Sequence, residues 1–359
     1  MTNQNLYVDI NVLQTVPSSN INRDDTGAPK TAIYGGVSRA RVSSQSWKHA
    51  IRESFKANDI TTGIRTKEAV QLLADKLNEI DTSLDEDAAL VKAADIFKAA
   101  GIKVSKDNET GALLLISPGQ IEKLAQYATD HDELDKKEVK TLLKSDNSLD
   151  LALFGRMVAD NPELNVEGSA QVAHAISTHE VVPEFDYYTA LDDLQSDDTS
   201  GAAMLGTIEY NSSTLYRYAN LNVNELAHNL GESSAVQGAA DFIKSFLLSM
   251  PTGKQNTFAN KTLPNYVMIT VRTDTPVNLV TAFEDAVASK HGYVAESVKK
   301  LEDEYQSTLR FVDQPVSTIV LSDSKYHSKL DDQAANLSEL LKRVTEVLTK
   351  AVQDEDTTN

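Results

Sequence analysis

Residues 38–56 read SRARVSSQSWKHAIRESFK, a stretch in which a short extended segment passes into a helix. In its first half, Arg39, Arg41 and Ser43 alternate with small apolar residues, so these three share one face. After Ser43 or Ser44, either of which is a good N-cap, four apolar residues recur at helical spacing: Trp47, Ala50, Ile51 and Phe55. The helix is therefore expected to pack through this stripe and to present its basic residues outward, one turn apart. These are Lys48, Arg52 and Lys56.

The segments around residues 38–56 indicate an α+β protein. Residues 6–13 alternate like a half-buried strand, and residues 57–147 carry several amphipathic helical patterns, which we interpret as a helical insertion. Strand patterns return after residue 148, beginning with LALFG at 151–155. Two arms rich in aromatic and β-branched residues then flank an acidic middle, which predicts a long hairpin with its tip near 192–204. Strands and helices interspersed in this way are typical of a sheet domain with large insertions.

The composition is that of an ordinary folded protein rather than a disordered one, with 41% hydrophobic and 24% charged residues in 359. The absence of cysteine excludes disulfides, thiolate metal sites and a cysteine nucleophile. The N-terminal residues lack a secretory signal, and no run of about eighteen apolar residues occurs. We therefore expect a cytoplasmic protein with no membrane contact.

The charge distribution favours a phosphate-binding site in spite of a net charge of -19. Residues 20–56 hold seven Lys and Arg against three Asp and Glu. A serine-capped helix that follows alternating arginines is a sound cradle for phosphate, since its first N–H groups are unpaired and carry partial positive charge. The candidates are Arg39, Arg41, Ser43, Ser44, Gln45, Lys48 and Arg52. A solvated basic face would give the same pattern, and these residues alone favour neither interpretation.

Two further features have a functional and an ordinary interpretation. A second basic stripe lies on a predicted helix and would either contact phosphates or be an exposed helical face; it consists of Lys136, Lys137, Lys140 and Lys144. Met204 and Leu205 close the hairpin tip, where apolar side chains could wedge against bases or against a neighbouring subunit.

The sequence offers little support for catalysis. Asp24 and Asp25 could hold a divalent metal ion beside a phosphate, but neighbouring aspartates in a loop more often form Asx-turns or pair with an arginine, here Arg23. His174 and His179 lie five residues apart on a predicted strand, so they point to opposite faces and cannot ligate one metal ion together. We expect no enzyme, no metal and no cofactor.

Residues 20–52, NINRDDTGAPKTAIYGGVSRARVSSQSWKHAIR, resemble the N-terminal signature of the CasC family, the backbone subunit of the type I-E CRISPR Cascade complex. Six further segments occur in the order and approximate spacing of that family: FGRM, AHAISTHEV, TALDDLQ, LGTIEY, YRYANLN and PTGKQNTF. The resemblance runs from about residue 6 to residue 273.

The resemblance implies an RRM-like (ferredoxin-like) palm formed by residues 1–56 and 148–359, a helical fingers insertion at 57–147 and a thumb hairpin at 180–219. It implies that copies of the chain bind the backbone of a CRISPR RNA (crRNA) without sequence preference and stack along it head to tail. With the other Cascade subunits, they would present the crRNA for pairing with the target DNA strand in antiviral defence.

The family's contacts carry over only to matching positions. The guide backbone would be held by Arg23, Lys30, Arg41, Ser43, Gln45, Lys48 and Arg52. Leu205 would lie near a displaced nucleotide, and Lys254, in a motif loop, would touch RNA. Target DNA would be contacted by Lys136, Lys137 and Lys140. No contact is carried over for residues 158–168, where the chain is shorter than its relatives. Backbone proteins of other CRISPR types cut RNA with a loop aspartate, which keeps Asp24 or Asp25 as the alternative.

Overall fold

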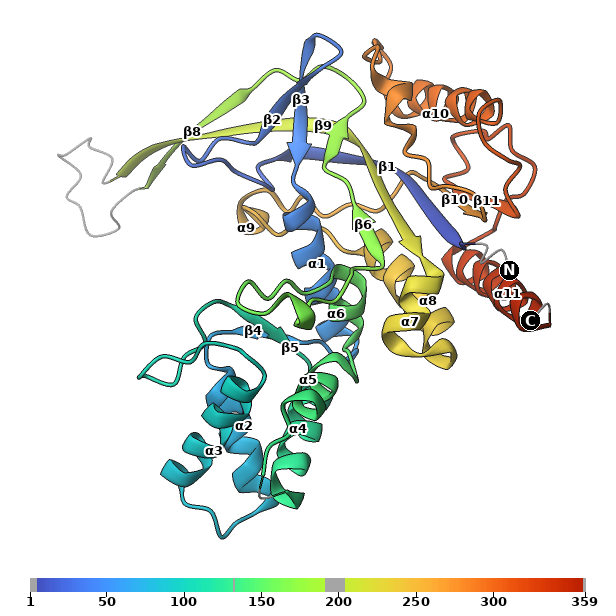
Figure 1. The fold of residues 1–359 in the computed structure, drawn as a ribbon. Coiled ribbons are helices and arrows are strands. Elements are labelled where there is room, and N and C mark those ends of the chain that lie inside the picture. The colour runs from blue at the N-terminus through green and yellow to red at the C-terminus, as the bar shows by residue number, and fades with distance from the viewer. Residues whose placement is uncertain (1–4, 132, 191–203, 358–359) are drawn as a thin grey trace, which may run out of the picture. The chain divides into compact units, whose positions relative to one another are not determined.

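The structure is a computed structural model that describes residues 5–131, 133–190 and 204–357, except for the side chains of residues 204 and 354–357. The chain divides into two compact units (Figure 1). The sheet unit comprises Met1–Ile51, Val172–Asn220 and Ile243–Asn359, and the helical unit comprises Arg52–Gln171 and Leu221–Phe242. The domain boundaries expected from the sequence stay a prediction.

The sheet unit is built on β1 (Tyr7–Ser19), an inner strand of a sheet with the order β11-β10-β1-β9-β7-β3-β2. Residues 8–14 of β1 are buried without interruption, which exceeds the half-buried strand that the alternation of residues 6–13 predicts. The reason is that both faces are covered, so polar residues such as Asp9 and Asn11 are buried as well. β1 pairs antiparallel with β10 (Tyr266–Arg272), from Tyr7 opposite Arg272 to Leu13 opposite Tyr266.

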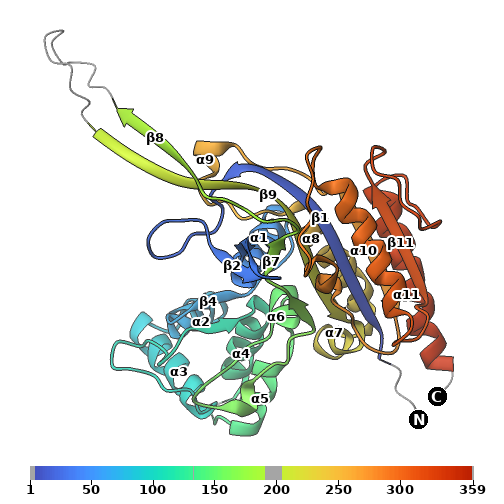
Figure 2. The same cartoon turned by 90° about the horizontal axis from the view of Figure 1, so that it is seen from above.

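The remaining strands of this sheet are β2 (Thr31–Tyr34), β3 (Val37–Val42), β6 (Ala170–Val172), β7 (Ala175–Ser177), β8 (Glu184–Ala190), β9 (Met204–Asn222) and β11 (Ser317–Ser322). Helix α10 (Val294–Thr308) packs on β1, and α11 (Leu337–Thr357) packs on β10 and β11 (Figure 2). A short 3-10 helix, η2 (Leu279–Phe283), adds Leu279 and Phe283 to the core between them. The α+β fold class is confirmed, and an antiparallel sheet with helices packed against it agrees with an RRM-like palm.

The predicted hairpin is present. β8 pairs with the first residues of β9, from Glu184 opposite Tyr210 to Ala190 opposite Met204. Every residue of β8 is exposed, so the two strands extend as a ribbon without a core of their own (Figure 2). The predicted tip, near 192–204, lies almost wholly outside the described residues.

The helical unit has its own apolar core. It is enclosed by α2 (Ala69–Ile80), α3 (Glu86–Ala99), α4 (Pro118–Asp130) and α5 (Lys136–Lys144), with a small ladder of β4 (Ile64–Thr66) and β5 (Leu114–Ile116) (Figure 1). α4 begins with a capping box between Ser117 and Gln120, which is the sequence signal of a helix start. The other helices of the chain are α1 (Ser44–Ala57), α6 (Leu149–Phe154), α7 (Val223–Leu230), α8 (Glu232–Leu248), α9 (Gln255–Phe258) and the 3-10 helix η1 (Pro162–Leu164).

The strand predicted at LALFG is wrong, because these residues belong to α6. Residues 149–153 are buried without interruption, and a short apolar run that is buried on all sides has no helical period to detect. The helix ends at Gly155, whose φ of 74° favours glycine.

Among the helices of the described residues, none is both long enough and apolar enough to span a membrane.

Candidate nucleic-acid interface

A narrow cleft in the sheet unit, of about 10 Å³, brings together β3, β9 and the loop that follows β1. It is lined by Lys30 and Arg41 and by uncharged residues that include Asn22, Asn211 and Ser213. The Arg41 backbone N–H donates to Lys30 O at 2.9 Å, and the Lys30 N–H donates to Asn22 O at 2.9 Å. The loop is therefore fastened along β3, and two of the predicted cations lie on one surface.

The guanidinium of Arg41 is held from two sides. Its Nε donates to Thr31 O at 3.0 Å, and Nη1 lies 3.2 Å from Nδ1 of His174. Within the described residues, neither Arg41 nor Lys30 forms an ion pair with a carboxylate. The two side chains therefore keep their full positive charge at the cleft.

The start of α1 lies beside this cleft. The carbonyl oxygen of Ser43 accepts from the N–H groups of Ser46 at 3.1 Å and Trp47 at 3.2 Å, so Ser43 is the N-cap of the two serines considered. Asn22 fixes the cap, because its Oδ1 accepts from the Ser43 N–H at 2.8 Å. The structure leaves Gln45 exposed and leaves Ser44 and Lys48 half-buried.

The side chain of Arg39 is fully buried, at 0% exposure, so it does not share the surface of Arg41, and its contact with RNA stays a prediction. Its guanidinium donates to Ser177 O at 3.0 Å and to Phe283 O at 2.8 Å, and burial lowers its pKa. The end of η2, Phe283, and the next residue, Glu284, cover this part of β3, so Arg39 and Arg41 have different environments in spite of their alternation. A contact across some 240 positions of sequence leaves no trace in a local pattern.

Arg52 is engaged inside the helical unit. Its Nε donates to Asp150 Oδ2 at 2.6 Å and Nη2 donates to Gly63 O at 2.8 Å. Asp150 is fully buried and also accepts from the Gly63 N–H and the Ser148 hydroxyl, each at 2.7 Å. The charge of Arg52 is therefore largely neutralised within the chain, and its contact with RNA stays a prediction.

The paired aspartates lie in the exposed loop with Arg23. Asp24 Oδ1 accepts from the Thr26 N–H at 2.9 Å, the Thr26 hydroxyl at 2.7 Å and the Ala28 N–H at 3.1 Å. The Thr26 hydroxyl bond lowers the pKa of the Asp24 carboxyl. Asp24 thus forms the Asx-turn that the sequence favoured over a metal ligand. In the part of the chain that is described, no three or more His, Asp or Glu side chains gather as a metal site would require.

The second lysine stripe lies on α5. Lys136, Lys137 and Lys144 are exposed, whereas Lys140 pairs with Glu163 at 2.5 Å. The hydrogen bond from Lys140 lowers the pKa of Glu163. One of the four lysines is therefore shared with a carboxylate, and contact of the stripe with DNA stays a prediction.

The remaining predicted residues lie on the hairpin and on the loop before α9. Leu205 is 60% exposed, as an apolar contact residue needs, while the side chain of Met204 lies outside the described part. Lys254 is half-buried and has a left-handed backbone, with a φ of 51°. A Cβ on the preceding Gly253 would lie 2.5 Å from Ile21 O, so the loop of Lys254 packs directly against the loop of Lys30.

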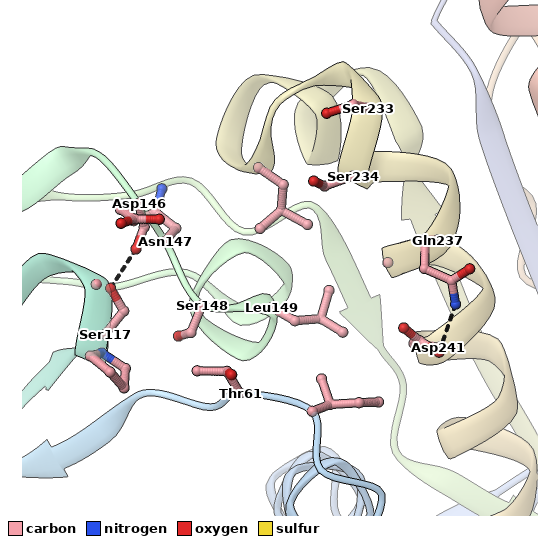
Figure 3. A pocket seen from close by; sticks show the side chains of 15 residues that line it. Thr61, Ser117, Asp146, Asn147, Ser148, Leu149, Ser233, Ser234, Gln237 and Asp241 are labelled. Atoms are coloured by element: carbon pink, nitrogen blue, oxygen red, sulfur yellow. Dashed lines mark hydrogen bonds between the residues drawn. The ribbon is translucent and has the colours of Figure 1, made fainter.

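A second cleft, of about 530 Å³, lies within the helical unit (Figure 3). Ser117, Asp146 and Asn147 line one side, and Gln237 and Asp241 on α8 line the other, where Gln237 donates to Asp241 at 3.1 Å. No lining residue of this cleft is Lys, Arg or His, so it lacks the charge that a phosphate backbone attracts.

Asn22 and His174 are two residues at the interface that the sequence analysis did not assign to it. Asn22 lies within the quoted signature, but nothing local shows that its amide caps a helix twenty residues later. Nothing in the local sequence links His174 to the cleft, since its contact with Arg41 joins segments 133 positions apart.

The comparisons with known proteins agree with this architecture. A model of the CT1975-like protein family matches residues 8–346. The chain belongs to this family. A comparison with curated proteins gave no match.

Two solved chains have the same fold as this member of the CT1975-like family. One, from a pre-nicking CRISPR RNA-guided surveillance complex, is 32% identical with a TM-score of 0.84, over 95% of this chain and 99% of the other. The second, from a CRISPR RNA-guided surveillance complex, is 28% identical with a TM-score of 0.72 over the same shares of both chains. The resemblance to a subunit of a CRISPR surveillance complex, predicted from the motifs, is confirmed.

Proposed function

We propose that this chain is the backbone subunit of a type I-E CRISPR RNA-guided surveillance complex. Copies of it bind the crRNA backbone without sequence preference, stack head to tail along it and present it for pairing with target DNA. The other Cascade subunits would be its partners, and a cytoplasmic location goes with this role. The observation that carries the proposal is the pair of cations, Lys30 and Arg41, that line one cleft without carboxylate partners.

The chemistry of the cleft supports backbone binding rather than base reading. Lys and Arg neutralise phosphates regardless of the base, whereas sequence reading needs several side chains directed at base edges. A guide must also keep its bases available for pairing with the target, so a subunit that holds any guide gains from gripping phosphates alone. Head-to-tail contacts between identical copies generate an open filament, whose length the RNA would set.

RNA titrations of the full-length chain at several salt concentrations test this proposal. We expect a steep decrease of affinity with salt, and each of Lys30→Ala and Arg41→Ala should reduce the slope of log K against log salt by about 0.7, the value for one phosphate contact on a single strand. Lys290→Ala, on an exposed loop, is the matched control and should leave the slope unchanged. Salt-independent binding, or an equal effect of the control, would contradict the proposal.

We further propose that the subunit does not cut RNA. The alternative, cleavage with Asp24 or Asp25 and a divalent metal, is disfavoured because Asp24 Oδ1 already closes its own loop with three hydrogen bonds. Incubating the assembled complex with complementary RNA and Mg²⁺ should leave the RNA intact. Regularly spaced cleavage that Asp24→Ala or Asp25→Ala abolishes would establish the alternative.

A further inference from the structure

His174, in the link between β6 and β7, makes a hydrogen bond whose direction fixes its charge. Nη1 of Arg41 lies 3.2 Å from Nδ1 of the imidazole. Because a guanidinium can only donate, Nδ1 must be the acceptor, so the ring is neutral and carries its proton on Nε2. The imidazole and the Thr31 carbonyl thus hold the fork of Arg41 between them.

The charges around the imidazole keep it neutral in the free chain. Partial burial lowers the pKa of His174, and the positive charges of Arg41 and Lys30 lower it further. These two residues, on β3 and just before β2, are the charged groups that act on the ring. The link that holds His174 also pairs with β9, because the Ala173 N–H donates to Tyr218 O. Burial raises the pKa of Tyr218, so this tyrosine stays uncharged.

We propose that His174 is a phosphate-binding residue of the RNA interface, which positions Arg41 in the free chain and takes up a proton from solvent when a phosphodiester binds. This inference rests on the proposed function. On binding, the phosphate oxygens replace Nδ1 as acceptor for Arg41, and the imidazolium donates to the same phosphate. One proton moves from solvent to Nδ1, and no covalent bond changes.

The sign of the pH dependence follows from this exchange. In the free chain two cations disfavour a proton on His174, and the negative phosphate offsets them in the complex. The complex therefore holds more protons than the free chain, so RNA affinity increases as the pH falls and becomes constant at alkaline pH, where His174 is neutral in both states. A rise of one unit in the pKa of one group corresponds to about a tenfold gain in affinity between these limits.

The test is a titration of the full-length chain with a labelled single-stranded RNA of mixed sequence between pH 5.5 and 8.5 at constant ionic strength. For the unaltered chain we expect affinity to rise about three- to tenfold from pH 8 to pH 6, within the linkage limit. His174→Gln keeps an acceptor for Arg41 but cannot gain a proton, so the affinity of this variant should show no rise from pH 8 to pH 6. His291→Gln, at another exposed histidine, is the control and should keep the rise.

Two observations would overturn the proposal. One is a pH dependence that His174→Gln leaves intact. The other is a His174 pKa, measured by NMR on the imidazole Cε1 proton, that does not increase when RNA is added. The variant Arg41→Ala distinguishes a failure of the His174 proposal from a failure of the proposed function. If Arg41→Ala weakens binding while the His174 variant behaves like the unaltered chain, only the role of His174 is wrong; if Arg41→Ala changes nothing at any pH, the RNA interface itself is wrong.

Discussion

The ion pair of Arg52 and Asp150 tests which cations of the basic segment are structural. The Asp150 side chain is fully buried and that of Arg52 is 15% exposed. Replacing Arg52 with alanine removes one of three donors to the carboxylate and leaves the Gly63 N–H and the Ser148 hydroxyl in place. The buried charge then has no cationic partner.

Removing one partner of a buried ion pair costs about 3–5 kcal/mol, and the two remaining donors place Arg52→Ala near the lower end, at about 3 kcal/mol. In a domain of about 150–250 residues each kcal/mol lowers the Tm by roughly 2–4 °C, so the melting temperature of the helical unit should decrease by about 6–12 °C. RNA affinity, measured well below this transition, should keep the salt slope of the unaltered chain, because the guanidinium is already neutralised.

Thermal unfolding followed by circular dichroism, together with the RNA salt titration, measures both quantities. Lys56→Ala is the matched control on the same helix, since Lys56 pairs with Glu53 at 2.8 Å with both side chains about half exposed. Exposed pairs of this kind contribute only about 0.3–0.5 kcal/mol. If Arg52→Ala melts within a degree or so of Lys56→Ala, the structural role of Arg52 is wrong. If Arg52→Ala reduces the salt slope as Arg41→Ala does, Arg52 contacts RNA.

Three further predictions concern pH, backbone strain and the second basic stripe. Burial raises the pKa of Asp9 from 3.8 to about 6. The free energy of unfolding should therefore decrease as the pH rises through this window, by up to about 3 kcal/mol. Urea unfolding at pH 4–7 should show that Asp9→Asn removes this decrease. Gly35 and Gly36 both have positive φ, but a Cβ on Gly35 would lie 1.6 Å from the carbonyl oxygen of Glu284, whereas a Cβ on Gly36 would meet nothing within 4 Å. In the same assay, Gly35→Ala should therefore destabilise the fold by at least about 2 kcal/mol more than Gly36→Ala. Glu163→Gln releases Lys140 from its ion pair, so binding of target DNA by the assembled complex should tighten, and unchanged or weaker binding would count against the stripe as a DNA contact.

The sequence predicted those features whose signal is local. The stripe of Trp47, Ile51 and Phe55 has a helical period and is buried as expected, and the hairpin arms pair as their β-branched and aromatic content indicates. A capping serine and a basic ladder likewise need only neighbouring residues to be recognised.

The features that the sequence could not give depend on contacts between distant segments. Arg39 and Arg41 have the same local pattern, and contacts with distant residues, Phe283 at the end of η2 and Ser177 on β7, bury the first while the second reaches the cleft. The contact of Arg41 with His174 joins β3 to the link before β7 in the same way. Residue type and spacing therefore located the candidate interface, while tertiary contacts decided which of its cations are available.

The net charge of -19 need not oppose phosphate binding at the cleft, because no carboxylate side chain lines it. The residues lining the cleft include Lys30 and Arg41 but no Asp or Glu. Arg39 and Arg217, two buried arginines of this unit, bond to carbonyl and amide oxygens, whereas the buried Arg272 pairs with Asp274 and Asp9. At physiological ionic strength charges are screened over about 8 Å, so carboxylates beyond that distance oppose a bound phosphate only weakly. The local charge of the cleft then sets the affinity, and the acidic remainder of the surface disfavours RNA bound anywhere else.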